Sequence, residues 1–305
     1  MKCKICGNAD TRVIYQLTKS DLNVLRCPIC GFTFSEYQGD EKNLASDGHG
    51  PQGVLDVDPN YCRKFQGRVQ LYEKVCGPLR GKSVLDVGAG GGAWLMAALG
   101  AGAAVEGIEL CQDCRSYARD VNRLALDDRP VHDPYWRSRA GQFDVVTSWD
   151  VLEHVPDPRG FLLDCISLVA PGGHLLFSTP VRDTKLDSLG ILLYHCTFGR
   201  VQFILRNRYS RVHLQIFHSD QLKSLLVEKG LRPMYYRAFQ EFSFPMEQYF
   251  VNVGFRRPGA DLMGRLASWT IGVLPIENKI MGIFANPSTA EAENHSQKRS
   301  PSGIG

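Results

Sequence analysis

Residues 83–94 read SVLDVGAGGGAW, and this stretch decides the fold. An apolar strand runs into four glycines, Gly88, Gly90, Gly91 and Gly92, and a helix-forming segment follows them. Because side chains would keep a ligand away from the backbone there, the glycines mark a place where a ligand lies against the strand end. Their spacing also fits a dinucleotide fingerprint, so the glycines alone do not identify the ligand.

Outward from this stretch, short apolar runs alternate with helix-length segments. This alternation predicts a parallel sheet with helices on both faces, the doubly wound α/β class. Strands are expected at 83–87, 104–109, 143–149 and 174–179, and helices at 94–99, 113–122 and 160–169. A helix is also expected at 61–76, with Phe65, Val69 and Tyr72 or Glu73 on one face. Towards the C-terminus we expect a helix from Ser219 or Asp220 to Lys229, a strand at 234–239, a mainly helical segment to Leu274 and a strand at 280–285.

Two acidic residues narrow the choice of ligand. Asp86 lies two residues before the first glycine, where its carboxylate would repel a pyrophosphate. S-adenosylmethionine (SAM) has no phosphate and carries an ammonium and a sulfonium, so Asp86 favours SAM over a dinucleotide. Glu109 ends the next expected strand and is placed to accept hydrogen bonds from both ribose hydroxyls. The alternative for Glu109 is an exposed acid at a strand end.

A second long motif lies further along the chain. Residues 143–157 read FDVVTSWDVLEHVPD. Together with VLDVGAGGG at 84–92 and with Glu109, this stretch resembles class I SAM-dependent methyltransferases and is especially similar to the ubiquinone-biosynthesis O-methyltransferase type. The resemblance covers residues 60–240. It implies a Rossmann-like sheet of seven strands whose final strand is antiparallel.

The resemblance also implies roles for individual residues. It assigns seven of them to the cofactor: Asp86, Gly88 and Gly90 at the methionine end of SAM, Glu109 at the ribose, Asp133 near adenine N6, and Trp149 and Asp150 where the methyl-bearing end meets the acceptor. His132 is the alternative to Asp133.

Two histidines are candidates for the catalytic base. The sulfonium already makes the methyl group electrophilic, so the protein must align a nucleophile and manage its proton. His154 is the first candidate because an imidazole titrates near neutrality. The alternative is that Glu153 and His154 cap or anchor a helix. His213 is the second candidate, since its segment resembles one that borders the substrate cavity in these relatives; a purely structural histidine is its alternative.

Asp150, Glu153 and His154 also resemble the acidic, acidic, histidine arrangement that some quinone-precursor methyltransferases use for a divalent cation. At helical spacing, Asp150 and His154 would share a face, with Glu153 beside them. Asp150 replaces the more usual glutamate at the first position. Base and cation site therefore remain alternatives at this motif.

The N-terminal cysteines form two pairs, Cys3 with Cys6 and Cys27 with Cys30, each followed by a glycine. Their spacing predicts one tetrahedral Zn²⁺ held by two knuckles of a small β ribbon. About forty residues bury too little apolar area to fold alone, so the metal would be structural. Redox use of the pairs is the alternative. Cys111 and Cys114 have no matching pair and are expected to be free thiols.

Composition and organisation add further expectations. The chain has 35 basic and 32 acidic residues, a net charge of +3 that is too weak to require a nucleic-acid or anionic-lipid partner. With no apolar signal core and no run of 18 apolar residues, a soluble, cytoplasmic protein is expected. The expected divisions are a zinc ribbon at 1–40, a linker at 41–60, a methyltransferase domain at 61–287 with a lid-like insertion at 181–211, and a disordered tail at 288–305.

These features predict methyl transfer from SAM to a small molecule, such as a sugar, a quinone precursor or another metabolite or lipid. The leucines, aromatics and arginines of the insertion suit a lid over the acceptor; contact with a membrane surface or ordinary packing are its alternatives. Zinc ribbons joined to methyltransferases also resemble a ribosomal RNA guanine methyltransferase group, so RNA is the alternative acceptor. A non-catalytic SAM-binding or zinc-ribbon interaction protein is the alternative of another class.

Overall fold

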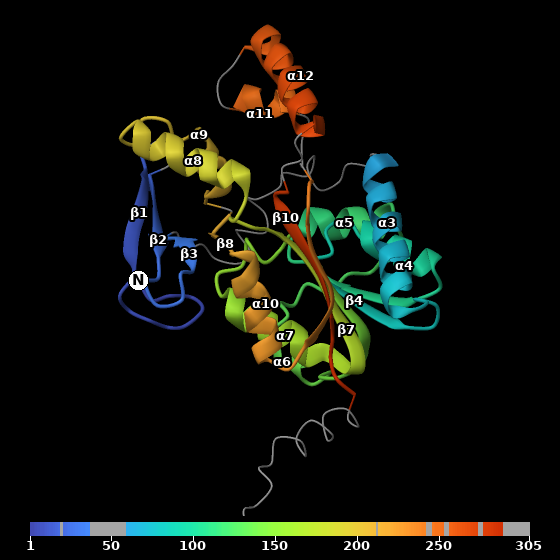
Figure 1. Ribbon diagram of the computed structural model, residues 1–305. Coiled ribbons are helices and arrows are strands. Elements are labelled where there is room, and N and C mark those ends of the chain that lie inside the picture. The colour runs from blue at the N-terminus through green and yellow to red at the C-terminus, as the bar shows by residue number, and fades with distance from the viewer. Residues whose placement is uncertain are drawn as a thin grey trace, which may run out of the picture.

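A twisted, mostly parallel sheet forms the centre of the computed structural model (Figure 1). The model describes residues 1–18, 21–36, 59–211, 213–241, 246–252, 256–273 and 277–288. The strand order is β5-β4-β6-β7-β10-β9; the first four strands are parallel, and β10 is antiparallel to both β7 and β9. The doubly wound α/β prediction is confirmed. The strands are β4 Ser83–Val87, β5 Ala104–Ile108, β6 Phe143–Trp149, β7 Val169–Pro180, β9 Arg232–Phe239 and β10 Lys279–Ala285.

Six strands, not the expected seven, pair in this sheet within the described residues. Next to β5, the place of a further strand is taken by an isolated parallel bridge between Ile108 and Asp127. Asp127 exchanges backbone hydrogen bonds with Gly107 and Glu109, both at 2.9 Å. The Arg129 side chain then folds back onto the Asp127 carboxylate, and Pro130 has no amide to donate, so the pairing stops after one residue.

Helices cover both faces of the sheet because its strands are apolar on both faces. Val84 and Leu85 illustrate this: neighbours on β4, they point to opposite faces and enter two separate core clusters. α3 and α4 bury Phe65, Tyr72 and Trp94 on one face, as the periodicity of 61–76 predicts. α6, α7 and α10 cover the other. The helices are α3 Pro59–Cys76, α4 Ala93–Gly100, α5 Gln112–Asp120, α6 Pro134–Arg137, α7 Pro158–Leu168 and α10 Ser219–Glu228.

The start of α10 differs in detail from the expectation. Its N-cap is His218, rather than Ser219 or Asp220, and the His218 amide donates to Gln221 Oε1 at 3.3 Å. Ser219 is engaged elsewhere, because its amide donates to an Asp183 carboxylate oxygen at 3.1 Å.

The N-terminal ribbon is completed by a strand from the methyltransferase domain, a pairing that the sequence did not predict. A separate antiparallel sheet has the order β1-β2-β3-β8. The ribbon also shares a core with the larger domain, because Phe32 packs on Phe217 with 4.9 Å between ring centroids. The expected linker lies almost wholly outside the described residues. These strands are β1 Arg12–Leu17, β2 Leu22–Arg26, β3 Thr33–Ser35 and β8 Gln215–Ile216.

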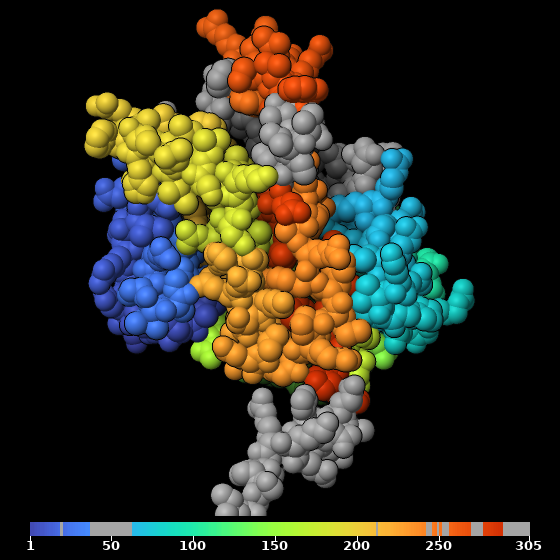
Figure 2. Space-filling view, in the orientation of Figure 1, coloured from blue at the N-terminus to red at the C-terminus, as the bar shows by residue number. Residues whose placement is uncertain are grey.

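The expected insertion contains two helices, α8 Lys185–Cys196 and α9 Phe203–Arg208, which lie over the ribbon (Figure 2). Tyr194 packs edge-on against Tyr15 of β1. α11 Met246–Asn252 and α12 Arg257–Val273 separate β9 from β10. No helix among the described residues is long and apolar enough to cross a membrane. Of the expected tail, only residue 288 is described.

Candidate functional site

The glycine loop joins β4 to α4 and turns tightly against the neighbouring segments. Gly88 adopts φ +81°, and a Cβ there would meet a methyl carbon of Val151 at 2.3 Å. Any larger residue would therefore be both strained and in collision at this position. Gly90 also has positive φ, and its amide donates to Glu109 Oε2 at 2.6 Å. The loop consequently closes onto the end of β5.

Glu109 is held in place by backbone amides. Its other carboxylate oxygen accepts the Cys111 amide at 2.8 Å, and the residue is 8% exposed. Burial raises the pKa of Glu109, and the amides of Cys111 and Gly90 offset part of that rise. A fixed carboxylate at a strand end can accept further hydrogen bonds from a pair of neighbouring hydroxyls.

Asp86 lies on β4, is almost fully buried and has one hydrogen-bonding partner. Thr147 Oγ1 donates to its carboxylate at 2.6 Å. Burial raises the pKa of Asp86 to about 7, against the opposing effect of Thr147. A buried carboxyl of this kind is stabilised in its charged form when a cation binds beside it. The site is therefore suited to a ligand ammonium.

Arg68 of α3 is a site residue that the sequence analysis missed. It is 4% exposed, and its guanidinium lies over the Trp149 ring at 4.2 Å. One terminal nitrogen donates to Ser178 Oγ at 3.4 Å and to Glu241 at 3.3 Å. The other, Nη1, is buried with no hydrogen-bond partner within the described parts of the chain. An unpartnered buried guanidinium nitrogen is suited to a ligand carboxylate.

The signal that could have revealed Arg68 is its place in the helix. It stands one residue before Val69 and three after Phe65, on the face that the periodicity of 61–76 predicts to be buried. A charged residue on such a face needs partners, and the described residues supply none for Nη1.

Asp150 follows β6 with φ +57° and belongs to a charged cluster. Its carboxylate accepts hydrogen bonds from Lys279 Nζ at 2.7 Å and Ser178 Oγ at 2.9 Å, and Lys64 Nζ lies 3.8 Å away. Burial alone would raise the pKa of Asp150, but Lys279, Lys64 and Arg68 outweigh it and hold the pKa below its usual range. Asp150 is therefore a carboxylate already paired with cations.

The helical spacing expected for Asp150, Glu153 and His154 is wrong. These residues form turns, and the next helix, α7, begins at Pro158. The left-handed conformation of Asp150, together with Pro156, prevents a continuous helix there. Asp150 consequently points into the Lys279 cluster and does not share a helix face with His154.

Instead, Glu153 and His154 meet His213, which comes from just before β8. One potential ligand atom from each of the three lies within 4.8 Å of those of the other two, and the two imidazole rings are 4.9 Å apart. Glu153 is 2% exposed and accepts a hydrogen bond from Thr179 Oγ1 at 3.0 Å. Burial, assisted by the charge of Asp150, raises the pKa of Glu153 to about 8. The group can exchange a proton near neutral pH or hold a cation.

Asp133 stands at the N-cap of α6, where its carboxylate accepts the Tyr135 amide at 2.8 Å. His132 beside it is exposed. Asp127 lies closer to Glu109, since its carbonyl accepts the Glu109 amide at 2.9 Å, but the Asp127 carboxylate is bound to Arg129. Contact of Asp133 or His132 with adenine stays a prediction.

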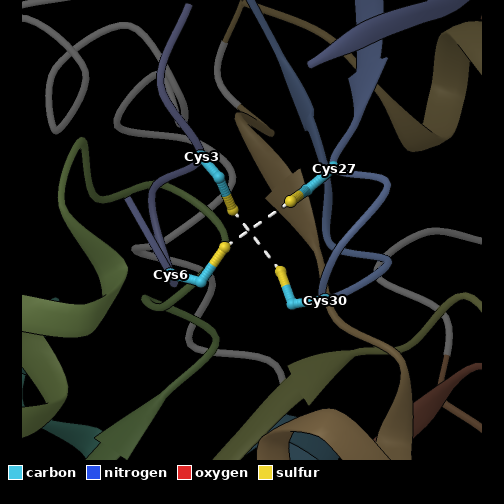
Figure 3. A group of neighbouring side chains, drawn as sticks. All are labelled: Cys3, Cys6, Cys27 and Cys30. Carbon is cyan, nitrogen blue, oxygen red and sulfur yellow. Dashed lines mark hydrogen bonds between the residues drawn. The ribbon is translucent and has the colours of Figure 1, made fainter. Parts of the chain in front are cut away.

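The four N-terminal cysteine sulfurs converge, as Figure 3 shows. Cys3 and Cys30 are 3.5 Å apart, as are Cys6 and Cys27, and all four sulfurs lie within 4.8 Å of one another. Tetrahedral Zn²⁺ with Zn–S bonds of about 2.3 Å requires sulfur separations of about 3.8 Å, so the geometry fits. Burial raises the pKa of Cys27, but the amides of Cys30 and Ile29 outweigh it and lower the pKa to about 6, which favours a thiolate ligand.

Known proteins are similar to this chain over its central part. A family model described as a methyltransferase domain matches residues 63–235. The ubiquinone biosynthesis O-methyltransferase of Thiobacillus denitrificans is 40% identical over 125 residues, which cover 38% of this chain and 51% of the relative. That of Acinetobacter baylyi is 38% identical over 158 residues, 43% of this chain and 66% of the relative. The chain thus spans about half to two thirds of the length of these relatives.

Solved structures show the same fold at low sequence identity. A putative methyltransferase from Bacillus halodurans has a TM-score of 0.52 at 17% identity and covers 73% of this chain and 100% of its own. A complex of the Haloferax volcanii Trm112 methyltransferase activator with a putative methyltransferase gives 0.52 at 14% identity, with coverages of 82% and 99%. The family match extends over more than half of the chain and includes the glycine loop, Glu109 and the turn after β6. This chain belongs to the class I SAM-dependent methyltransferases.

Proposed function

We propose that the protein transfers the methyl group of SAM to a hydroxyl of a small-molecule acceptor, with the Glu153, His154 and His213 group managing the proton. The observation that carries this proposal is that His154 and His213, 59 positions apart in the sequence, lie with their rings 4.9 Å apart beside a buried glutamate. Glu153 and His154 follow Trp149 and Asp150 at the carboxyl end of β6, and His213 is brought to them from the segment before β8. In open α/β sheets ligands bind at that edge.

Four residues would hold SAM. Asp86 suits its ammonium, the free nitrogen of Arg68 suits its carboxylate, and Glu109 suits its ribose hydroxyls. Trp149, buried against Arg68 and Trp94, would form an apolar wall. When bound, SAM supplies an electrophilic methyl group that needs no further activation.

The protein's own task is then to orient the acceptor and to take its proton. His154 is the proposed base. The imidazolium that results would lie 3.9 Å from Glu153 and would favour loss of the Glu153 proton to solvent, and the carboxylate so formed would stabilise it. A phenolic or enolic hydroxyl is the chemistry that such a base serves best, because its oxygen becomes a good nucleophile once deprotonated.

A small molecule related to a quinone precursor is the preferred acceptor, because the curated relatives are named for ubiquinone biosynthesis. The two helices of the insertion, held by the buried ion pair between Arg208 and Asp187 at 2.8 Å, would cover it. The four cysteines would hold a structural Zn²⁺ in the ribbon.

The decisive experiment combines calorimetry with SAM and transfer of a labelled methyl group into fractionated cell extract. SAM binding with label in small metabolites supports the proposal, whereas label only in RNA refutes the small-molecule acceptor. SAM binding without transfer to any fraction supports the non-catalytic alternative. His154→Asn should bind SAM normally and transfer little methyl.

A further inference from the structure

Strand β8 joins the ribbon to the proposed catalytic group. Its residues pair with β3 of the ribbon, Phe34 opposite Gln215 and Thr33 opposite Ile216. One residue earlier, the Leu214 carbonyl accepts the Ser35 amide at 2.7 Å. Since His213 immediately precedes this pairing, its backbone position is fixed by the ribbon.

Gln215 extends this connection to the turn that carries Glu153 and His154. Its side chain is fully buried, and the amide nitrogen donates to two carbonyls, those of Leu152 and Val155, each at 2.7 Å. These carbonyls flank Glu153 and His154 on either side. One side chain is thus hydrogen-bonded to the turn on both sides of Glu153 and His154.

A backbone hydrogen bond also joins β8's preceding residue to this turn. The Leu214 amide donates to the Glu153 carbonyl at 2.8 Å. The turn between β6 and α7 is therefore attached to β8 by three hydrogen bonds, although the two segments are about sixty residues apart in the sequence.

The other side of Gln215 faces the cysteine knuckles. Lys4, next to Cys3, donates from Nζ to Gln215 Oε1 at 3.1 Å. The second knuckle is tied down separately, because the Gln221 side chain of α10 donates to the Cys30 carbonyl. Both knuckles thus contact the segment that runs from β8 into α10.

The cofactor side of the site, defined as Asp86, Gly88, Gly90 and Glu109, has no such connection. The hydrogen bonds found for these residues involve β4, β5, β6, α5 and the loops between these elements, and none reaches the described residues of the ribbon. The acceptor side, defined as Glu153, His154 and His213, is the half that contacts β8.

We propose that Gln215 is a positioning residue through which the four-cysteine ribbon sets the geometry of the acceptor side while leaving the cofactor side unchanged. This inference rests on the proposed function for its kinetic consequences. The ribbon then has a defined role in the reaction, even though its cysteines lie outside the site.

The test uses two variants and one control in the full chain. Gln215→Leu keeps most of the side-chain volume and removes all three side-chain hydrogen bonds. Lys4→Met keeps the stem and removes only the contact from the ribbon. Lys2→Met is the control, because Lys2 is exposed on the same segment. SAM affinity is measured by calorimetry, kinetics with the acceptor found by labelling, and backbone amide exchange over residues 150–156.

Loss of one part-buried bond from an ammonium predicts a fall in kcat/KM for the acceptor of about fivefold for Lys4→Met. Loss of this bond and of two neutral bonds predicts a fall of about thirtyfold for Gln215→Leu, with SAM affinity changed less than about twofold in either variant. Amide exchange over 150–156 should accelerate in both variants and stay unchanged in Lys2→Met. A conservative Gln215→Asn variant should recover part of the loss, since it keeps the donor group.

Two results would overturn the proposal. One is a lower melting temperature in both variants with unchanged kcat, unchanged acceptor KM and unchanged exchange over 150–156, which means a merely structural role. The other is a parallel loss of SAM affinity, which means a general disturbance of the domain. If the wild-type protein binds SAM and transfers no methyl group, the proposed function fails, and the exchange measurement still decides the coupling.

Discussion

The cofactor side and the acceptor side are built in different ways. The cofactor side comes from consecutive strands and their loops: Asp86 and Glu109 lie 23 positions apart, and one hydrogen bond from Gly90 joins the loop to Glu109. The acceptor side consists of the turn after β6 and of His213, which lie side by side. Strand β3 of the N-terminal ribbon pairs with β8, which follows His213 and is hydrogen-bonded to the turn. The first half is local in sequence and the second is not.

This difference shows how a common fold can acquire a particular acceptor. A cofactor shared by a whole family needs the same few groups each time, and short motifs at strand ends supply them. The proposed acceptor side combines a turn within that frame, which carries Glu153 and His154, with segments added to it, here β8, the insertion and the ribbon that pairs with β8. We therefore expect substitutions on the two sides to separate SAM affinity from acceptor turnover.

The largest expected effect is on the acceptor side. His154→Asn should lower kcat by about 10²- to 10⁴-fold, the range for losing a general base, while SAM affinity stays within about twofold. Single-turnover methyl transfer and calorimetry measure the two quantities. A decrease of less than about threefold would remove His154 from the role of base, and the same loss in His213→Asn would assign the role to His213.

Asp86→Asn should weaken SAM binding on the cofactor side. Removing the carboxylate leaves the ligand ammonium without its buried partner, which costs about 10²-fold in SAM affinity. Calorimetry measures this change. Asp113→Asn, an exposed acid at the start of α5, is the matched control. Normal SAM affinity in Asp86→Asn would show that the ammonium lies elsewhere.

Removal of the Zn²⁺ proposed for the ribbon tests whether the ribbon affects the acceptor side alone. Because bound metal contributes to the folding of small cysteine modules, chelation should lower the melting temperature. It should reduce acceptor kcat/KM by about ten- to thirtyfold through the loss of the hydrogen bonds around β8. SAM affinity should stay within about twofold. Metal analysis should find one Zn²⁺ per chain before treatment, and Cys6→Ser should reproduce the effect, whereas Cys76→Ser, a change at a half-buried thiol of α3, should not.

The sequence predicted the cofactor side well because its signals are local. Apart from the short helix α6, the order of strands and helices from residue 83 to 180 agrees with the pattern of apolar runs, and the structure adds a hydrogen bond between Gly90 and Glu109. Arg68 was missed because its function depends on the burial of one face of a helix outside the motif. Burial of a charge is a tertiary property that spacing alone does not reveal.

On the acceptor side the sequence identified the histidines but not their arrangement. His154 and His213 were separate candidates, and only the fold brings their rings together. The expected helical face at 150–154 was wrong, because the left-handed Asp150 and its contact with Lys279 turn the chain away. The pairing of β3 with β8 joins residues about 180 positions apart, and two-residue strands have no periodicity to detect.

The last expected effect is a pH dependence confined to the cofactor side. With the pKa of Asp86 raised to about 7 in the folded protein, its carboxyl is protonated below that pH. SAM binding must then release this proton, so SAM affinity should rise by up to about tenfold per pH unit as pH approaches 7 from below, and level off above it. Calorimetry between pH 5.5 and 8 measures this slope, which should vanish in Asp86→Asn.

The raised pKa of Asp86 affects the stability of the ligand-free protein in the opposite direction: stability should decrease as pH rises. Between the pKa of an unfolded aspartate and about 7, the folded protein holds a proton that the unfolded chain has released. The free energy of unfolding therefore falls as pH rises through that window. Asp86→Asn should flatten this decline, while Asp113→Asn should leave it unchanged. A SAM affinity independent of pH in the wild-type protein would mean that Asp86 is already ionised before SAM binds, with a cation of the protein beside it.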